Sequence, residues 1–225
     1  MSGLKGGLLD AGGTLFRVRY TRAERIGRFL REAGFDPDPE ALERATLEAD
    51  LEFNWPEPDV RTRAEEKGLW RAYCRRVLSA SRLPTDPGLV RRLAEATDYL
   101  NFLELFPDTL PALEAWRRRG LRLGVVSNAV PSFREAIDRL GLTPYFDAII
   151  ISAEVGLAKP DPAVFRLGLG RLGLVPGEAF FVDDLPRHVR AAREAGLHGF
   201  LIVRSPTADP PGDLPTVRSL AELAL

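Results

Sequence analysis

The sequence is short of the residues that build disulfide-linked or membrane-inserted structures. Its 225 residues include a single cysteine, Cys74, so no disulfide can form within the chain, and a reducing compartment is the simplest setting. No apolar run approaches the roughly 18 residues that a membrane helix needs. The apolar stretch near the N-terminus is interrupted at Asp10, too early for a secretory signal. We therefore predict a cytoplasmic protein with no membrane partner.

The chain also lacks an excess of charge of either sign. Its 31 Lys and Arg residues against 32 Asp and Glu residues give a formal net charge of −1, and the isoelectric point is near 6.2. This balance removes the electrostatic basis for binding nucleic acid. The predicted partner is a small molecule, and the sequence leaves monomer and homodimer equally open.

What the sequence does contain is an alternation of apolar strands and helices, interrupted once by a helical block. Short apolar runs typical of buried parallel strands cover residues 6–9, 121–127, 147–152, 178–182 and 199–203, and helical patterns separate the later ones. Between about Thr21 and Asn101 the pattern is helical throughout. We predict an α/β fold with a doubly wound parallel sheet and an inserted all-helical cap domain. The core would comprise residues 1–15 and 105–225, and the cap residues 16–104.

Polar side chains follow four of these predicted strands. In chain order they are Asp10 and Thr14, Ser127 and Asn128, Lys159 after a loop, and Asp183 with Asp184. Because parallel strands end at one edge of the sheet, these residues are expected to meet in a single crevice. Each feature alone is common as a cap, a turn or a surface charge, but four in order indicate a functional site.

The chemistry of this set favours nucleophilic catalysis by a carboxylate. Asp10 lies in a loop of small residues and can reach an electrophile, while the backbone of Gly12 and Gly13 can hold anionic oxygens. Lys159 supplies positive charge against the nucleophile and the transferring group. Two further aspartates beside Asp10 would repel it unless a cation intervenes, and hard oxygen ligands suit Mg²⁺.

Four segments resemble the motifs of the haloacid dehalogenase superfamily. They are residues 8–16 (LLDAGGTLF), 125–129 (VVSNA), 156–162 (GLAKPDP) and 181–184 (FVDD), and the helical insertion is similar to the cap of its subfamily I. The resemblance implies that Asp10 is the nucleophile, acting with Thr14 and Lys159. It also implies a phosphate site formed by Gly12, Gly13, Ser127 and Asn128. The implied Mg²⁺ ligands are Asp10, the Gly12 carbonyl, Asp183 and Asp184.

One position departs from the pattern of the family's phosphatases. They usually carry an aspartate two residues after the nucleophile, which protonates the leaving group and later activates water, whereas this chain has Gly12. The loss of such an acid–base group typically costs about 10²–10⁴-fold in rate. His188 could substitute for it, but a histidine early in a helix more often faces solvent or caps the helix.

Three functions remain open on these grounds. The first is a Mg²⁺-dependent phosphatase of a small phosphorylated metabolite. The second is a 2-haloacid dehalogenase, whose reaction also needs no acid at position 12; it fits less well because this chain has an aspartate pair in the fourth motif, and Phe165 where those enzymes have tyrosine. The third is a catalytically impaired member that binds a phosphorylated ligand or a protein partner.

Overall fold

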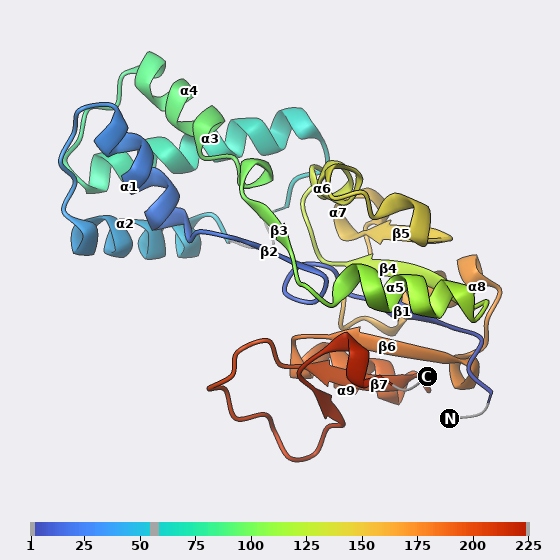
Figure 1. The fold of residues 1–225 in the computed structure, drawn as a ribbon. Helices are drawn as coiled ribbons and strands as arrows, with labels where there is room; N and C mark the ends of the chain where they lie inside the picture. The colour runs from blue at the N-terminus through green and yellow to red at the C-terminus, as the bar shows by residue number, and fades with distance from the viewer. Residues whose placement is uncertain (1–2, 55–58, 224–225) are drawn as a thin grey trace. The chain divides into compact units, whose positions relative to one another are not determined.

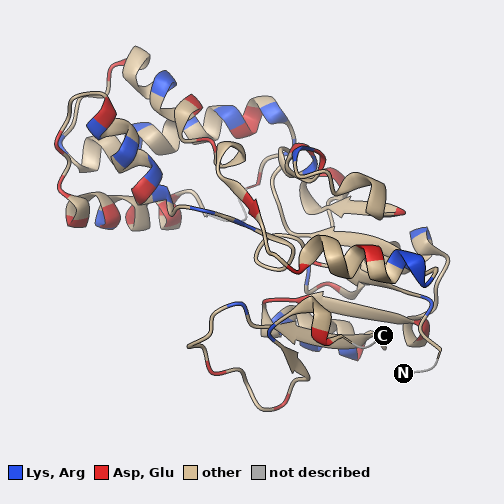
Figure 2. Cartoon of the chain, in the orientation of Figure 1, with Lys and Arg blue, Asp and Glu red and all other residues tan. Residues whose placement is uncertain are grey.

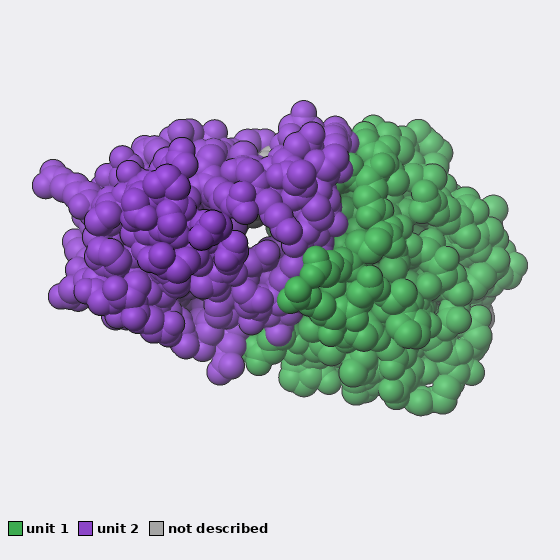
Figure 3. Space-filling model, turned by 90° about the horizontal axis from the view of Figure 1, so that it is seen from above, with its two compact units in different colours: residues 1–17, 104–129, 133–225 green, residues 18–103, 130–132 purple. Residues whose placement is uncertain are grey.

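The computed structural model describes residues 3–54 and 59–223, which divide into two compact units (Figure 3). The first comprises residues 1–17, 104–129 and 133–225, and the second residues 18–103 and 130–132. Within the described residues, no helix combines the length and the apolar character required to cross a membrane. Residues of both signs of charge occur on the helices (Figure 2).

The first unit is built on a parallel sheet, as the alternating pattern predicts. Its strands are β1 (Gly6–Leu9), β4 (Arg122–Ser127), β5 (Ala148–Ile151), β6 (Ala179–Asp183), β7 (His198–Ile202) and β8 (Thr216–Val217). They lie in the order β5-β4-β1-β6-β7-β8, and each neighbouring pair is parallel (Figure 1). The strand that carries Asp10 is therefore central, flanked by the strands that carry Ser127 and Asp183.

Helices cover both faces of this sheet. They are α5 (Thr109–Arg118), α6 (Phe133–Arg139), α7 (Ser152–Val155), α8 (Pro162–Leu172) and α9 (Pro186–Glu194). Successive residues of a strand point to opposite faces. Phe180 of β6 packs edge-on against Trp116 of α5, whereas Phe181 packs edge-on against Phe165 of α8. The two helices therefore lie on opposite faces, which explains why the strands read as continuous apolar runs.

The second unit consists of helices packed on one another. They are α1 (Arg22–Glu32), α2 (Pro39–Glu52), α3 (Arg63–Ala80) and α4 (Pro87–Ala96), followed by the 3-10 turn Tyr99–Asn101. Thr21 and Thr62 each begin a helix with a capping box, and Asp38 and Asp86 each cap a helix whose first turn contains proline. Cys74 is buried in the shared core, as expected of an ordinary helix residue.

Three residues outside the inserted block also belong to the helical unit. Residues 130–132 come three residues after the end of β4, yet the main-chain amide of Ser132 donates to Glu66 of α3 at 2.9 Å, and its hydroxyl donates to the same carboxylate at 2.5 Å. The hydroxyl groups of Ser132 and Tyr99 are 2.8 Å apart. The division predicted from the sequence lacked this segment, and the bonds that tie it to the helical unit join residues 33 and 66 positions apart in the chain.

The shortest elements were not predicted. Strands β2 (Phe16–Val18) and β3 (Leu103–Leu105) form a two-stranded sheet at the two ends of the helical block, and β8 extends the main sheet at its edge. Two or three residues are too few to show the alternation by which a strand is recognised. Helix α7, four residues long, likewise replaces the loop expected between β5 and Lys159.

Candidate active site

The register of the sheet brings the nucleophile strand into line with its neighbours. Leu9 of β1 pairs with Val182 of β6 and with Val125 of β4. The amide of Asp10 continues the ladder by donating to the Val182 carbonyl at 2.9 Å. Asp10 therefore emerges beside Asp183, and the expected convergence at the carboxyl edge of the sheet is present.

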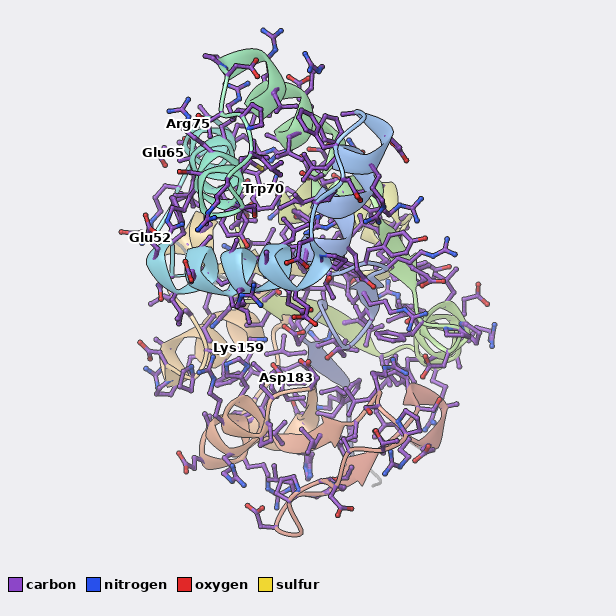
Figure 4. The ribbon with its side chains drawn as sticks, turned by 90° about the vertical axis from the view of Figure 1, so that its left-hand side faces the viewer. Glu52, Glu65, Trp70, Arg75, Lys159 and Asp183 are labelled. Carbon is purple, nitrogen blue, oxygen red and sulfur yellow. The ribbon has the colours of Figure 1, made fainter. Side chains whose placement is uncertain are left out.

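Lys159 bridges the two carboxylates. Its Nζ lies 2.5 Å from Asp10 Oδ1 and 2.7 Å from Asp183 Oδ2, so one ammonium group binds both carboxylates. Lys159 and Asp183 lie near each other in Figure 4. All three side chains are at least nine-tenths buried. Burial alone would lower the pKa of Lys159, but the attraction of both carboxylates outweighs it and raises that pKa. The lysine is accordingly a fixed positive charge.

Asn128 holds the main chain of Lys159. Its Nδ2 donates to the Lys159 carbonyl at 2.8 Å, and its Oδ1 accepts from the Lys159 amide at 2.7 Å. The sequence pattern predicted Asn128 as a phosphate-binding residue, whereas these two bonds turn both ends of its amide toward the backbone of the β5–α8 connection. The contacts favour a role in placing Lys159.

The two oxygens of Asp10 differ in their surroundings. Oδ1 accepts from Lys159 at 2.5 Å and, at 3.4 Å, from the buried Ser127 hydroxyl, whereas neither of these two groups bonds to Oδ2. Burial raises the pKa of Asp10 to about 6; the Asp183 carboxylate adds to the rise, and Lys159 opposes it. Lys159 and Ser127 therefore bind the same oxygen of the Asp10 carboxylate.

Both oxygens of the Asp183 carboxylate have hydrogen-bond partners inside the protein. Besides Lys159, it accepts from the Leu185 amide at 2.8 Å, and His188 Nδ1 lies 3.1 and 3.2 Å from its two oxygens. His188 is only 2% exposed, so the expectation that it faces solvent or caps its helix is wrong. His188 follows Asp183 by five residues and lies in the first turn of α9, which places its ring beside the Asp183 carboxylate at the end of β6.

Asp184 has a different environment from its neighbour. It forms no ion pair within the described part of the chain. It lies against the loop of residues 11–16 that follows Asp10 (the nucleophile loop), where a Cβ on Gly13 would fall 2.4 Å from its Oδ2. Burial raises the pKa of Asp184 to about 7, and the negative charges of Asp10 and Asp183 add to the rise. A carboxylate so placed is suited to receive a further cation.

The cation site itself is not a cluster of side chains alone. In the ranges 3–54 and 59–223, no three His, Cys, Asp or Glu side chains converge closely enough to hold a metal ion. The predicted set instead depends on a main-chain carbonyl, that of Gly12. The surroundings of Asp10 and Asp184 fit a hard cation, because a buried and a half-buried carboxylate with raised pKa values need additional positive charge to ionise together.

Thr14, predicted to be catalytic, belongs to the loop that follows Asp10, and it is entirely buried. Its hydroxyl has no hydrogen-bond partner in the described chain, while its carbonyl accepts from Arg204 at 2.5 Å. Arg204 and its partner Asp108 were absent from the sequence-based site. Arg204 carries the same signal as the others, a polar residue just after an apolar strand, but Asp108 preceded a predicted helix and had the pattern of a cap.

The comparisons with known proteins identify the family of the chain. The family model of haloacid dehalogenase-like hydrolases matches residues 5–196, so the chain belongs to that family and is a hydrolase. A phosphoserine phosphatase of Thermus thermophilus is 36% identical over 213 residues, covering 92% of this chain and 82% of that protein. The enzyme is therefore phosphatase-like.

Solved structures are similar over almost the whole chain. A HAD phosphatase from Thermococcus onnurineus has a TM-score of 0.68 and 25% identity, covering 98% of this chain and 96% of that one. A 2-haloacid dehalogenase from Pseudomonas syringae has a TM-score of 0.65 and 23% identity, with the same coverage of both chains. The second similarity concerns the fold alone, and the fold does not separate the two chemistries.

The close approach of Gly13 to Asp184 predicts that Gly13→Ala will damage the site. Gly13 has φ +81°, where a side chain costs about 1 kcal/mol or more, and its new methyl group would collide with the Asp184 carboxylate. Gly120→Ala is the matched control, since Gly120 has φ +77° and nothing within 4 Å of an added Cβ.

We expect the free energy of unfolding, measured in urea, to fall by similar amounts in both variants. Only Gly13→Ala is expected to lose about 10-fold or more in the rate of p-nitrophenyl phosphate hydrolysis. Equal activities would refute the predicted role of this contact.

Proposed function

We propose that the protein is a Mg²⁺-dependent phosphatase that cleaves a small phosphorylated metabolite through an aspartyl-phosphate on Asp10. The observation that carries the proposal is the lysine-bridged pair of Asp10 and Asp183, with Asp184 as an additional carboxylate that forms no ion pair within the described residues. Such a site holds more negative than positive charge, and it suits an anionic phosphate only when a cation is bound.

The residues divide into those that would bind the cation and those that support them. Asp10, the Gly12 carbonyl and Asp184 are the proposed ligands. Asp183 was also predicted as a ligand, but its bonds to Lys159, Leu185 and His188 favour a supporting role. A bound Mg²⁺ would neutralise charge on the phosphate oxygens and on these carboxylates.

The chain's own groups then account for the two halves of the reaction. A carboxylate oxygen of Asp10 attacks phosphorus, a new P–O bond forms, and the bond to the leaving oxygen breaks with its electron pair going to that oxygen. Lys159, Ser127 and the amides of the Gly12–Gly13 turn stabilise the charge that develops. Water then attacks phosphorus, the P–O bond to Asp10 breaks with its electron pair returning to the carboxylate, and the water gives up a proton to solvent. Inorganic phosphate is released and Asp10 is regenerated.

The test is a paired assay on the purified protein. Hydrolysis of p-nitrophenyl phosphate is measured with Mg²⁺ and after chelation, and halide release from 2-chloropropionate is measured in parallel. Metal-dependent phosphate release supports the proposal. Metal-independent halide release would instead identify a dehalogenase, and absence of both reactions would identify a binding protein without turnover.

Gly12→Asp is expected to restore the missing acid–base group. A Cβ at this position would lie 3.7 Å from Phe133 Cζ, an ordinary contact, and Gly12 is not among the residues with positive φ. Turnover of an alkyl phosphate, which has a poor leaving group, should rise about 10–100-fold, and that of p-nitrophenyl phosphate by less than about 3-fold. Gly12→Asn, of equal size but unable to donate as an acid, is the control. If Asp and Asn act alike, or if both substrates gain equally, the missing acid does not limit the reaction.

A further inference from the structure

A second, partly buried ion pair lies against the loop of residues 11–16 that follows the nucleophile. Arg204 follows the end of β7, and its Nη1 donates to both oxygens of Asp108 at 2.9 and 2.8 Å. Its Nη2 donates to the Thr14 carbonyl, and the guanidinium lies 4.1 Å from the centre of the Phe106 ring. Both charged side chains are about 15% exposed, so solvent screens the pair only weakly.

Asp108 stands at the start of a helix but does not cap it with its side chain. It occupies the N-cap of α5, where an aspartate normally accepts from the helix's own amides, but it makes no such bond. Its carboxylate instead accepts from the Ser219 hydroxyl at 2.8 Å and from the Leu220 amide at 2.6 Å, in addition to Arg204. The pair thus joins the start of α5, the end of β7 and the C-terminal segment.

Residues outside the nucleophile loop bind two of its main-chain carbonyls, those of Thr14 and Leu15. Within the loop, the Ala11 carbonyl accepts from the amides of Leu15 and Phe16. On the outside, Arg204 binds the Thr14 carbonyl, and the Thr109 hydroxyl binds the Leu15 carbonyl at 2.6 Å. Two successive peptide groups of the loop are therefore oriented by residues distant in sequence, only four and five positions after Asp10.

We propose that Arg204 is a positioning residue for the hydrolase reaction. By holding the Thr14 carbonyl and Asp108 together, it keeps the Ala11–Phe16 loop in the form that aims Asp10 and presents the Gly12 carbonyl and Gly13 amide. A displacement of about 1 Å at a reacting group can cost about 10²-fold in rate. The inference rests on the phosphatase activity proposed above for its kinetic consequence, but not for its effect on the loop.

The experiment compares Arg204→Met with Arg190→Met in the full-length protein. Arg190 makes a bidentate pair with Asp213 at 2.9 and 3.0 Å, but that pair is about half exposed and does not contact the loop. We measure kcat and KM for p-nitrophenyl phosphate with saturating Mg²⁺, and amide hydrogen exchange in a peptide covering residues 8–17. Arg204→Met is expected to lower kcat about 10–100-fold, to leave KM within about 2-fold, and to accelerate exchange of the loop amides. Arg190→Met is expected to change none of these.

Arg204→Lys separates positioning from charge. Lysine retains the charge but cannot span both acceptors with a rigid fork, so kcat should fall between the values of the parent and of Arg204→Met. Unchanged kcat in Arg204→Met, or exchange that accelerates equally throughout the chain, would overturn the proposal. If the parent hydrolyses no phosphate ester, the proposed function fails separately. The exchange comparison then decides alone: faster exchange confined to the loop supports the positioning role, and unchanged exchange there overturns it.

Discussion

Asp10→Asn is expected to lower p-nitrophenyl phosphate hydrolysis by about 10⁴-fold or more while leaving the protein folded. An amide oxygen is too weak a nucleophile to attack phosphorus, so the covalent step is lost rather than slowed. The asparagine oxygen can still accept from Lys159, whose second partner, Asp183, is unchanged. The measurement is kcat under saturating substrate, with mass spectrometry of acid-quenched enzyme to detect the phosphorylated form.

Asp161→Asn is the matched control for this substitution. Asp161 belongs to the same motif as Lys159, but it is exposed and its carboxylate accepts from the Ala163 amide at 2.8 Å to cap α8. Asparagine caps helices equally well, so activity and stability should stay at the parental values. An Asp10→Asn variant that retained activity within 10-fold of the parent would eliminate Asp10 as the nucleophile.

Lys159→Met is expected to lower both activity and stability strongly. The substitution removes the positive charge shared by Asp10 and Asp183, which are 9% and 0% exposed in their side chains. Leaving buried charges without a partner typically costs about 3–5 kcal/mol. We expect a loss of this size in the free energy of unfolding, measured in urea without divalent cations, together with at least a 10³-fold fall in turnover.

Two further variants define the cause of the Lys159 effect. Lys5→Met removes a lysine that pairs with Glu178 at the surface, where such pairs contribute about 1 kcal/mol or less. Adding Asp183→Asn to Lys159→Met removes one of the stranded charges and should recover part of the lost stability, without recovering activity. If the double variant is less stable than Lys159→Met, the stabilising role of Lys159 is not electrostatic.

The location of the site could be predicted because it depends on strand ends. Continuous apolar runs indicate strands covered on both faces, and parallel strands end at a common edge. Asp10, Ser127, Lys159 and Asp183 could therefore be assigned to one crevice, and the register of β1 with β6 bears this out for Asp10 and Asp183. The elements that escaped prediction were two to four residues long.

The supporting contacts could not be predicted, because they join residues whose spacing carries no period. His188 is brought to Asp183 by one turn of α9, and Arg204 reaches Thr14 across 190 positions of the chain. Asn128 holds the backbone of Lys159 only because β4 and β5 are neighbours in the sheet. Each of these depends on packing between elements, which a local pattern does not encode.

The sequence by itself determined the family, the order of the strands and helices, and the residue types available at the carboxyl edge of the sheet. It treated Asp183 and Asp184 as equivalent. Only the tertiary structure separated them: successive residues leaving a strand point in opposite directions, so Asp183 turns inward to Lys159 and His188 while Asp184 turns toward the nucleophile loop. Their different partners, rather than their identical chemistry, decide which of the two carboxylates is available to a cation.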